Sequence, residues 1–252
     1  MSKRFFIVAF ISGVFACFLS RFVYAEDALS LFREGNEAYR KQAYQKAYED
    51  YERASRKLPA AEIYYNMGNA VFKMNQLGRA IVNYSRARNL EPRNPDILEN
   101  LRYAKSLIEY RVEDKRNWYL RTVSELLQYF RLRELLFACF LIYFTLSLAW
   151  VLGLVMKKSL MPQSVHTALL AVLIVFSILS CAKFYQAKIQ KPAVVIQGKV
   201  DVRYGPSKSD KLAFSLVEGI QVDVEEKLDD WYRISLANKE SGWVPKEGIE
   251  IV

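Results

Sequence analysis

The spacing of hydrophobic and polar residues changes along the 252-residue chain. Residues 28–113 carry apolar side chains at helical spacing, and residues 192–252 carry short runs in which apolar and polar side chains alternate. Three uninterrupted apolar stretches lie outside these regions, one near each of residues 12, 145 and 175. Helical periodicity, strand alternation and long apolar runs each predict a different element. The pattern therefore predicts a multidomain membrane protein with an α-helical array, a two-helix transmembrane hairpin and a C-terminal all-β barrel.

The first apolar stretch has the features of an export signal. It follows Lys3 and Arg4, and small residues, Val23 and Ala25, stand where a signal peptidase needs them. We therefore expect residues 1–25 to be a signal peptide. Two alternatives stay open: an uncleaved membrane anchor, and a lipoprotein signal that ends at Cys17.

The other two stretches, 135–156 and 165–185, are each long enough to cross a bilayer as a helix. A short loop joins them, so they form a hairpin, and the regions before and after it lie on one side of the membrane. Lys157 and Lys158 in the loop favour a cytoplasmic loop, whereas basic residues at the other ends of both helices oppose it. The export signal favours the orientation in which the soluble regions lie outside the cytoplasm, on the periplasmic face of the inner membrane.

Within the helical region one pattern occurs twice. Its residues recur at an offset of 33, as between Gly35 and Gly68. The other matching pairs are Ala47 and Ala80, Tyr51 and Tyr84, Ala54 and Ala87, and Pro59 and Pro92. Small residues allow two helices to approach, and proline ends the second helix of each unit. A period of this length with two helices resembles the tetratricopeptide family.

We expect residues 28–113 to be a tetratricopeptide array of two repeats and a capping helix. The resemblance implies that the first helix of each repeat lines a concave face that binds segments of other proteins. The expected lining is Phe32, Asn36, Tyr39, Arg40, Tyr65, Asn69, Phe72, Lys73 and Tyr103. Some arrays grip a C-terminal carboxylate there, but Phe32 stands where that clamp needs lysine. An aromatic groove for a helix or extended segment is favoured; the alternative is that these aromatic residues only fill the superhelix.

Residues 117–133 predict an amphipathic helix just before the hairpin. One face of this helix, with arginines beside it, carries Trp118, Tyr119, Val123, Leu126, Leu127 and Phe130. Aromatic residues concentrate at the membrane interface, so we expect this helix to lie on the membrane surface. The alternative is a further soluble helix packed on the array.

The C-terminal region, 192–252, resembles the bacterial SH3 family. The similarity rests on Val202-Arg203, Gly205-Pro206-Ser207, Gly219, Trp231-Tyr232-Arg233-Ile234 and Gly242-Trp243-Val244. Members of that family bind cell-wall peptides or proteins through aromatic grooves. The resemblance therefore makes Tyr204, Trp231 and Trp243 the candidate ligand-binding residues; the alternative is that both tryptophans are structural.

Charge and cysteine content limit the partners and the kinds of site that we expect for this chain. The net charge is +9, but no basic block is long enough for a nucleic-acid arm, so we expect no nucleic-acid partner. The three cysteines and the single histidine lack metal-ligand spacing. No nucleophile–base pair, phosphate-binding glycine loop or paired carboxylates are evident. We therefore expect no catalytic residues, no metal and no cofactor.

The order of these modules resembles the BatE family of tetratricopeptide membrane proteins from the Bacteroides aerotolerance operon. The resemblance implies a non-enzymatic membrane scaffold that contacts von Willebrand factor A-type membrane proteins and contributes to oxidative-stress tolerance. A second hypothesis is a cell-envelope tether that binds peptidoglycan through the SH3-like domain.

Overall fold

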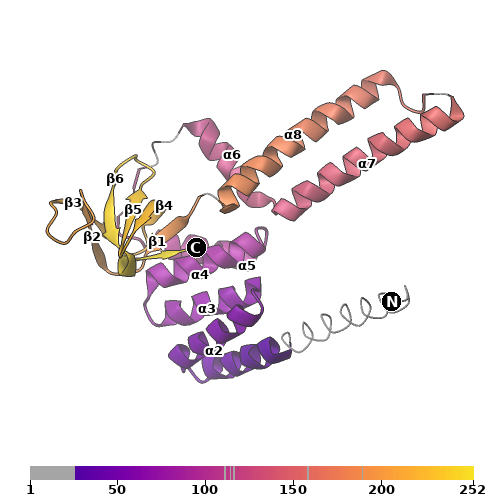
Figure 1. The fold of residues 1–252 in the computed structure, drawn as a ribbon. Coiled ribbons are helices and arrows are strands. Elements are labelled where there is room, and N and C mark those ends of the chain that lie inside the picture. The colour runs from indigo at the N-terminus through magenta and orange to yellow at the C-terminus, as the bar shows by residue number, and fades with distance from the viewer. Residues whose placement is uncertain (1–25, 111, 114, 116, 158, 189) are drawn as a thin grey trace, which may run out of the picture.

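The computed structural model describes residues 26–110, 112–113, 115, 117–157, 159–188 and 190–252. The expected signal peptide and Cys17 therefore lie outside the described residues. Figure 1 shows three parts: a stack of helices, a long helical hairpin and a β-sheet beside the last helices of the stack.

The stack begins with a helix over residues 26–40. Four further helices follow: α2 (Tyr44–Lys57), α3 (Ala61–Lys73), α4 (Leu77–Leu90) and α5 (Pro95–Ser106). Successive helices pack on each other in antiparallel order, and their apolar faces form the core. At the start of α5 the Asn94 side chain accepts hydrogen bonds from the backbone N–H groups of Asp96 and Ile97, which satisfies the first turn of that helix.

The sequence repeat corresponds to a repeated packing contact. A Cβ atom placed on Gly35 would lie 2.6 Å from the Tyr51 ring, and one on Gly68 would lie 2.6 Å from the Tyr84 ring. Both tyrosines are buried, at 1% and 2% exposure. Glycine is therefore required at both positions because the ring of the following helix occupies the space of a side chain.

The hairpin follows a short helix, α6 (Trp118–Tyr129). Its two long helices are α7 (Leu132–Met156) and α8 (Gln163–Lys188). They contain spans of 25 and 24 residues with a mean hydropathy of 2.3, long and apolar enough by length and composition to cross a membrane. Few of their side chains are buried within the protein, as expected of helices whose outer surface meets lipid.

The C-terminal region is a seven-stranded antiparallel sheet in the order β3-β2-β6-β5-β4-β1-β7. The strand bounds are β1 (Pro192–Val195), β2 (Lys199–Arg203), β3 (Leu212–Val217), β4 (Gln221–Leu228), β5 (Trp231–Ser235), β6 (Ser241–Pro245) and β7 (Ile249–Ile251). A 3-10 turn, η1 (Lys246–Gly248), joins the last two strands. One face buries an apolar core that includes Val202, Ile234 and Val244.

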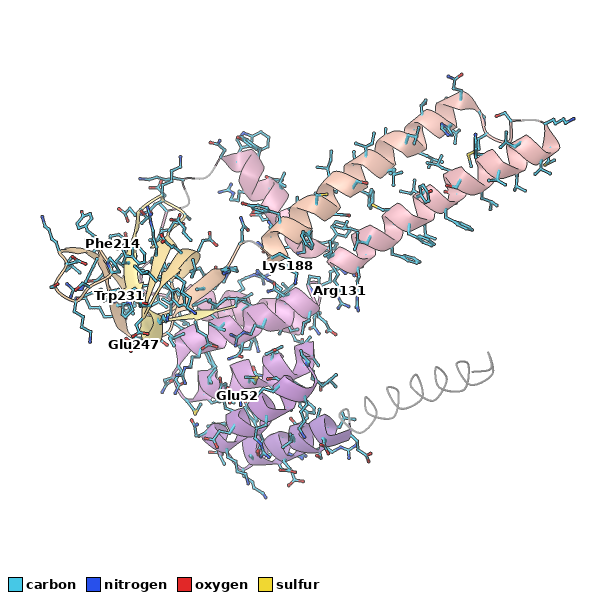
Figure 2. The ribbon with its side chains drawn as sticks, in the orientation of Figure 1. Glu52, Arg131, Lys188, Phe214, Trp231 and Glu247 are labelled. Carbon is cyan, nitrogen blue, oxygen red and sulfur yellow. The ribbon has the colours of Figure 1, made fainter. Side chains whose placement is uncertain are left out.

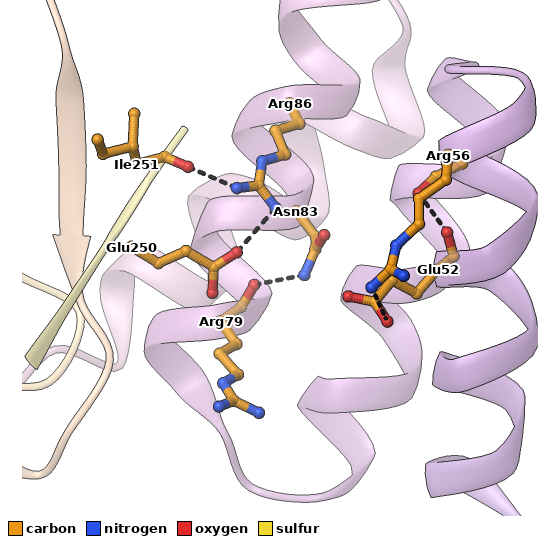
Figure 3. Close-up of polar contacts among 8 residues, drawn as sticks. Glu52, Arg56, Arg79, Asn83, Arg86, Glu250 and Ile251 are labelled. Carbon is orange, nitrogen blue, oxygen red and sulfur yellow. Dashed lines mark hydrogen bonds and ion pairs between the residues drawn. The ribbon is translucent and has the colours of Figure 1, made fainter. Parts of the chain in front are cut away.

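The closed barrel expected from the sequence does not form, because β3 and β7 end the strand order without pairing with each other. The β7 edge instead meets the helical stack. The Arg86 guanidinium on α4 donates to the Ile251 carbonyl and lies 2.8 Å from the Glu250 carboxylate (Figure 3). A helix that covers a sheet edge satisfies backbone groups that would otherwise be free to pair with another chain.

The sheet and the stack share further contacts. The Gly78 N–H on α4 donates to the Glu218 carboxylate at 2.8 Å, and the Lys105 ammonium on α5 donates to Gln221 at 2.7 Å. Val194 of β1 belongs to the same apolar cluster as Ile81 and Leu101 of the stack. The helical stack and the sheet therefore pack together through α4 and α5.

Candidate functional site

The expected concave lining includes an open cavity near the N-terminal end of the stack. Its volume is 290 Å³, and Asn36, Tyr39, Arg40, Tyr51 and Asn66 line it. Three of these residues were expected from the sequence, and the structure brings them together. The contacts of the sheet with the stack run through other residues of α4 and α5, so the cavity shares no lining residue with these contacts.

A line of tyrosine and asparagine side chains runs along the groove. In the first repeat the Tyr51 hydroxyl donates to Asn36 Oδ1 at 2.7 Å, and the Asn66 amide donates to the same oxygen at 3.3 Å. In the second repeat the Tyr84 hydroxyl donates to Asn69 Oδ1 at 2.8 Å, and the Asn100 amide donates there at 3.1 Å. The two asparagines expected in the lining thus hold equivalent positions and equivalent hydrogen bonds.

Burial keeps the two tyrosines neutral. It raises the pKa of Tyr51 to about 12 and raises the pKa of Tyr84 still further above its usual range. Both hydroxyls therefore remain donors to the asparagine oxygens at neutral pH. Because each oxygen already accepts two hydrogen bonds, the asparagines are held in place by the protein itself.

Aromatic pairs extend the groove along the stack. The ring centres of Phe32 and Tyr51 lie 5.7 Å apart, and those of Tyr65 and Tyr84 lie 5.9 Å apart, with nearly the same tilt. Further along, Phe72 lies 5.9 Å from Tyr103 on α5.

Two kinds of side chain among the expected lining residues are exposed at the surface. The Tyr103 side chain is 56% exposed. Arg40 and Lys73 are also exposed and stand at equivalent positions at the ends of their helices. The accessible surface is therefore aromatic and cationic.

Asn66 and Asn100 are the groove residues that the sequence reasoning missed. Asn66 lies one turn before Asn69 on α3, and Asn100 lies one turn before Tyr103 on α5, so their spacing placed them on the lining face. They were overlooked because the repeat was matched through identical residues only, whereas neither of these asparagines has an asparagine at the 33-residue offset.

Two of the candidate SH3 residues, Trp231 and Trp243, lie on the outer face of the sheet. Trp243 on β6 pairs with Arg203 on β2 and with Arg233 on β5. Directly opposed residues share a face, and so do residues two apart on one strand. Trp231 therefore joins Trp243 on this face, and both indoles are partly exposed.

Tyr204 lies apart from the two tryptophans in the strand pattern. It follows the last residue of β2 and its side chain is 69% exposed. The structure thus brings Trp231 and Trp243 together on one surface with two arginines, and places Tyr204 in the connection to β3. This surface offers two aromatic rings for stacking, and its two guanidinium groups lie near carboxylates, Arg203 at 3.7 Å from Asp201 and Arg233 at 3.5 Å from Glu225.

Comparison with known families assigns only the C-terminal region. Residues 198–250 match the family model of the bacterial SH3 domain. No curated protein matches the chain. Among the residues that the structure describes, no group of three or more histidine, cysteine, aspartate or glutamate side chains could hold a metal ion.

Proposed function

We propose that the chain is a non-enzymatic, membrane-anchored scaffold whose helical stack is a tetratricopeptide array that binds a protein segment in its groove. The observation that carries this proposal is the accessible groove itself. Its tyrosines and asparagines are fixed by mutual hydrogen bonds, and Arg40 and Lys73 are exposed at equivalent positions of the two repeats. A preorganised aromatic surface lowers the entropic cost of binding a peptide.

The partner proposed for this groove carries negative charge and apolar side chains. The domain order resembles the BatE family, so the proposed partners are membrane proteins with von Willebrand factor A domains in a complex for oxidative-stress tolerance. The soluble parts act outside the cytoplasm, at the inner membrane, and the hairpin holds them near such partners. Confinement to one membrane raises the effective concentration of the two proteins.

The test places a photo-crosslinking amino acid in native membranes at Tyr39, inside the cavity, or at Lys46, exposed on α2. Mass spectrometry then identifies what is captured. We expect the probe at Tyr39 to capture a defined membrane protein, and the probe at Lys46 not to capture that protein. Equal capture of the same proteins at both positions would reject the groove as the binding site.

A charge reversal then tests the contribution of the basic side chains. Arg40→Glu with Lys73→Glu should lower partner capture by about tenfold, because each reversed charge costs about 0.7 kcal/mol at exposed sites. The matched control is Lys46→Glu with Lys208→Glu, which makes the same change in net charge elsewhere. If the first variant captures the partner as well as the unaltered protein does, the two basic side chains do not contribute to binding.

A second candidate function is a tether to peptidoglycan. It is favoured by the exposed surface that carries Trp231, Trp243 and two arginines within a bacterial SH3 domain. Sedimentation of the protein with purified cell wall tests it. Trp243→Ala should abolish sedimentation of the protein with the cell wall. Tyr204→Ala, outside the strands, tests whether the loop after β2 also contributes to cell-wall binding. No sedimentation of the unaltered protein would exclude the tether.

A further inference from the structure

The base of the hairpin gathers positive charge where three helices meet. The end of α4, the start of α7 and the end of α8 contribute Arg88, Arg131, Lys183 and Lys188, which we call the basic junction. Figure 2 shows Arg131 and Lys188 at the hairpin base beside α4 and α5. The Lys183 ammonium donates to the Leu127 carbonyl of α6 at 2.7 Å, so α6 belongs to the same site.

The four cations of the basic junction form no close ion pair with the described residues, although Arg131 lies near enough to the Glu134 carboxylate to interact with it electrostatically. Among the described residues, no carboxylate lies within 4.0 Å of the side-chain nitrogens of these four residues. Glu134, at the start of α7, is already engaged, since it accepts from the Arg93 guanidinium and from the Arg131 backbone N–H at 3.1 Å each. Arg131 Nε is buried and has no hydrogen-bond partner in the described part of the chain.

Burial makes this arrangement costly without an anion. Arg88 is half-buried, and burial lowers the pKa of its guanidinium. Arg88 and Lys183 also lie close enough to repel each other. A buried donor or charge without a partner costs free energy that a bound anion would recover.

The position of the junction selects the kind of anion. α6 packs on α8 and carries exposed apolar and aromatic side chains; these are Trp118, Tyr119, Val123, Leu126 and Tyr129. Tryptophan and tyrosine concentrate at the level of lipid headgroups. The junction therefore lies at the depth of the phosphate groups once α7 and α8 cross a bilayer.

Space for a headgroup adjoins the junction. A cavity of 560 Å³ lies between the end of α8 and the sheet, and its lining includes Lys188, Lys191, Gln186 and Asn89. Glu225 and Glu226 of β4 also line it. Lysines and amides donate to a phosphate, and carboxylates accept from hydroxyl groups, so the lining suits a headgroup that carries both.

We propose that the basic junction binds the phosphate of an anionic phospholipid with a hydroxylated headgroup, whose acyl chains run along α7 and α8. Arg88 and Lys183 bind the phosphate from the protein side, and Lys188 binds it from the cavity. The bound lipid then fixes the helical stack and the sheet against the membrane surface. This goes beyond partner binding in the groove and depends only on insertion of the hairpin.

The test is native mass spectrometry of the full-length protein in detergent, titrated with phosphatidylglycerol or phosphatidylcholine. We expect phosphatidylglycerol to bind more tightly. Arg88→Gln with Lys183→Gln should weaken phosphatidylglycerol binding about 25-fold, at about fivefold for each cation removed near a membrane surface. Lys188→Gln, at an exposed position, should weaken it about fivefold without affecting folding.

The matched control is Lys208→Gln with Lys211→Gln, two exposed lysines in the β2–β3 connection. This variant has the same net charge as the double variant and should bind as the unaltered protein does. Equal affinity for the two lipids, or equal loss in the control, would overturn the proposal. Binding of inorganic phosphate as tight as that of phosphatidylglycerol would also overturn it, since the site would then serve a free anion.

Discussion

Gly78 gives a decisive test of the contact between the helical stack and the sheet. A Cβ atom at this position would lie 2.3 Å from the Val195 carbonyl oxygen and 2.9 Å from the Ile196 Cα. Both are backbone atoms of the sheet region, which cannot turn away as a long side chain can. Glycine is therefore needed in α4 because the first strand passes directly over it.

The sign of the effect of Gly78→Ala depends on that contact. In an isolated helix alanine is about 1 kcal/mol more stable than glycine. With the sheet in place, the added methyl overpacks the interface, at about 1–3 kcal/mol. It also displaces the Glu218 carboxylate that accepts from the Gly78 N–H at 2.8 Å, a bond to a charged group that contributes about 1.5–3 kcal/mol. We expect a net destabilisation of roughly 2–4 kcal/mol.

The assay is thermal unfolding of the full-length protein in detergent, with hydrogen exchange read at residues 192–197. Gly78→Ala should lower the transition temperature and speed exchange in this strand. The matched control is Gly198→Ala, since a Cβ there meets nothing within 4 Å. A Gly78→Ala protein as stable as the unaltered one, with unchanged exchange, would refute the packing of the sheet on α4.

Three further outcomes are expected. Tyr84→Phe removes the hydrogen bond to Asn69 and should lower the free energy of unfolding by about 1 kcal/mol, whereas Tyr103→Phe, at an exposed ring, should leave it unchanged. Burial, with Arg88 nearby, lowers the pKa of Lys105 to about 8, below its unfolded value. The folded protein then binds fewer protons between pH 8 and about 10.5, so stability should rise with pH across that window, and Lys105→Met should remove the rise in denaturant titrations. Reporter fusions after Lys115 and at the C terminus should both report an extracytoplasmic location; opposite sides would exclude the hairpin.

The sequence predicted the internal geometry of the repeat because that geometry depends on local spacing. Gly35 and Tyr51 are close in the chain, and the 33-residue offset reproduces their contact at Gly68 and Tyr84. The two long apolar helices could be predicted equally well, since uninterrupted apolar runs of this length favour few other structures.

Contacts between residues far apart in the chain could not be predicted from the sequence in the same way. The open sheet and the position of β7 depend on Arg86 and Glu250, which are 164 residues apart (250 minus 86) and carry no recognisable motif. Gly78 aligned with no glycine of the first repeat, where Gln45 stands at the corresponding position. Such a residue is explained only by the strand that passes over it.

Cys139 and Cys181 show the same limit. Their positions along the two long helices do not show which face each residue occupies, because that depends on rotation about the helix axis. Cys139 packs against α8, with its sulfur 3.8 Å from the Ser180 hydroxyl, whereas Cys181 is exposed and both thiols are free. Small residues thus mark where the two helices touch.

Two charged contacts near the C-terminal end of α4 fix the position of the helical stack. Arg86 joins α4 to the last strand, and Arg93, just beyond α4, joins the stack to Glu134 at the start of α7. These contacts hold the stack in a defined position relative to the sheet and to the first residues of α7. In the proposed scaffold, a partner segment anchored in the same membrane would meet a surface whose height and direction are already set, which would raise its effective concentration more than a flexible tether would. Loosening either arginine contact should therefore weaken partner binding without any change in the groove itself.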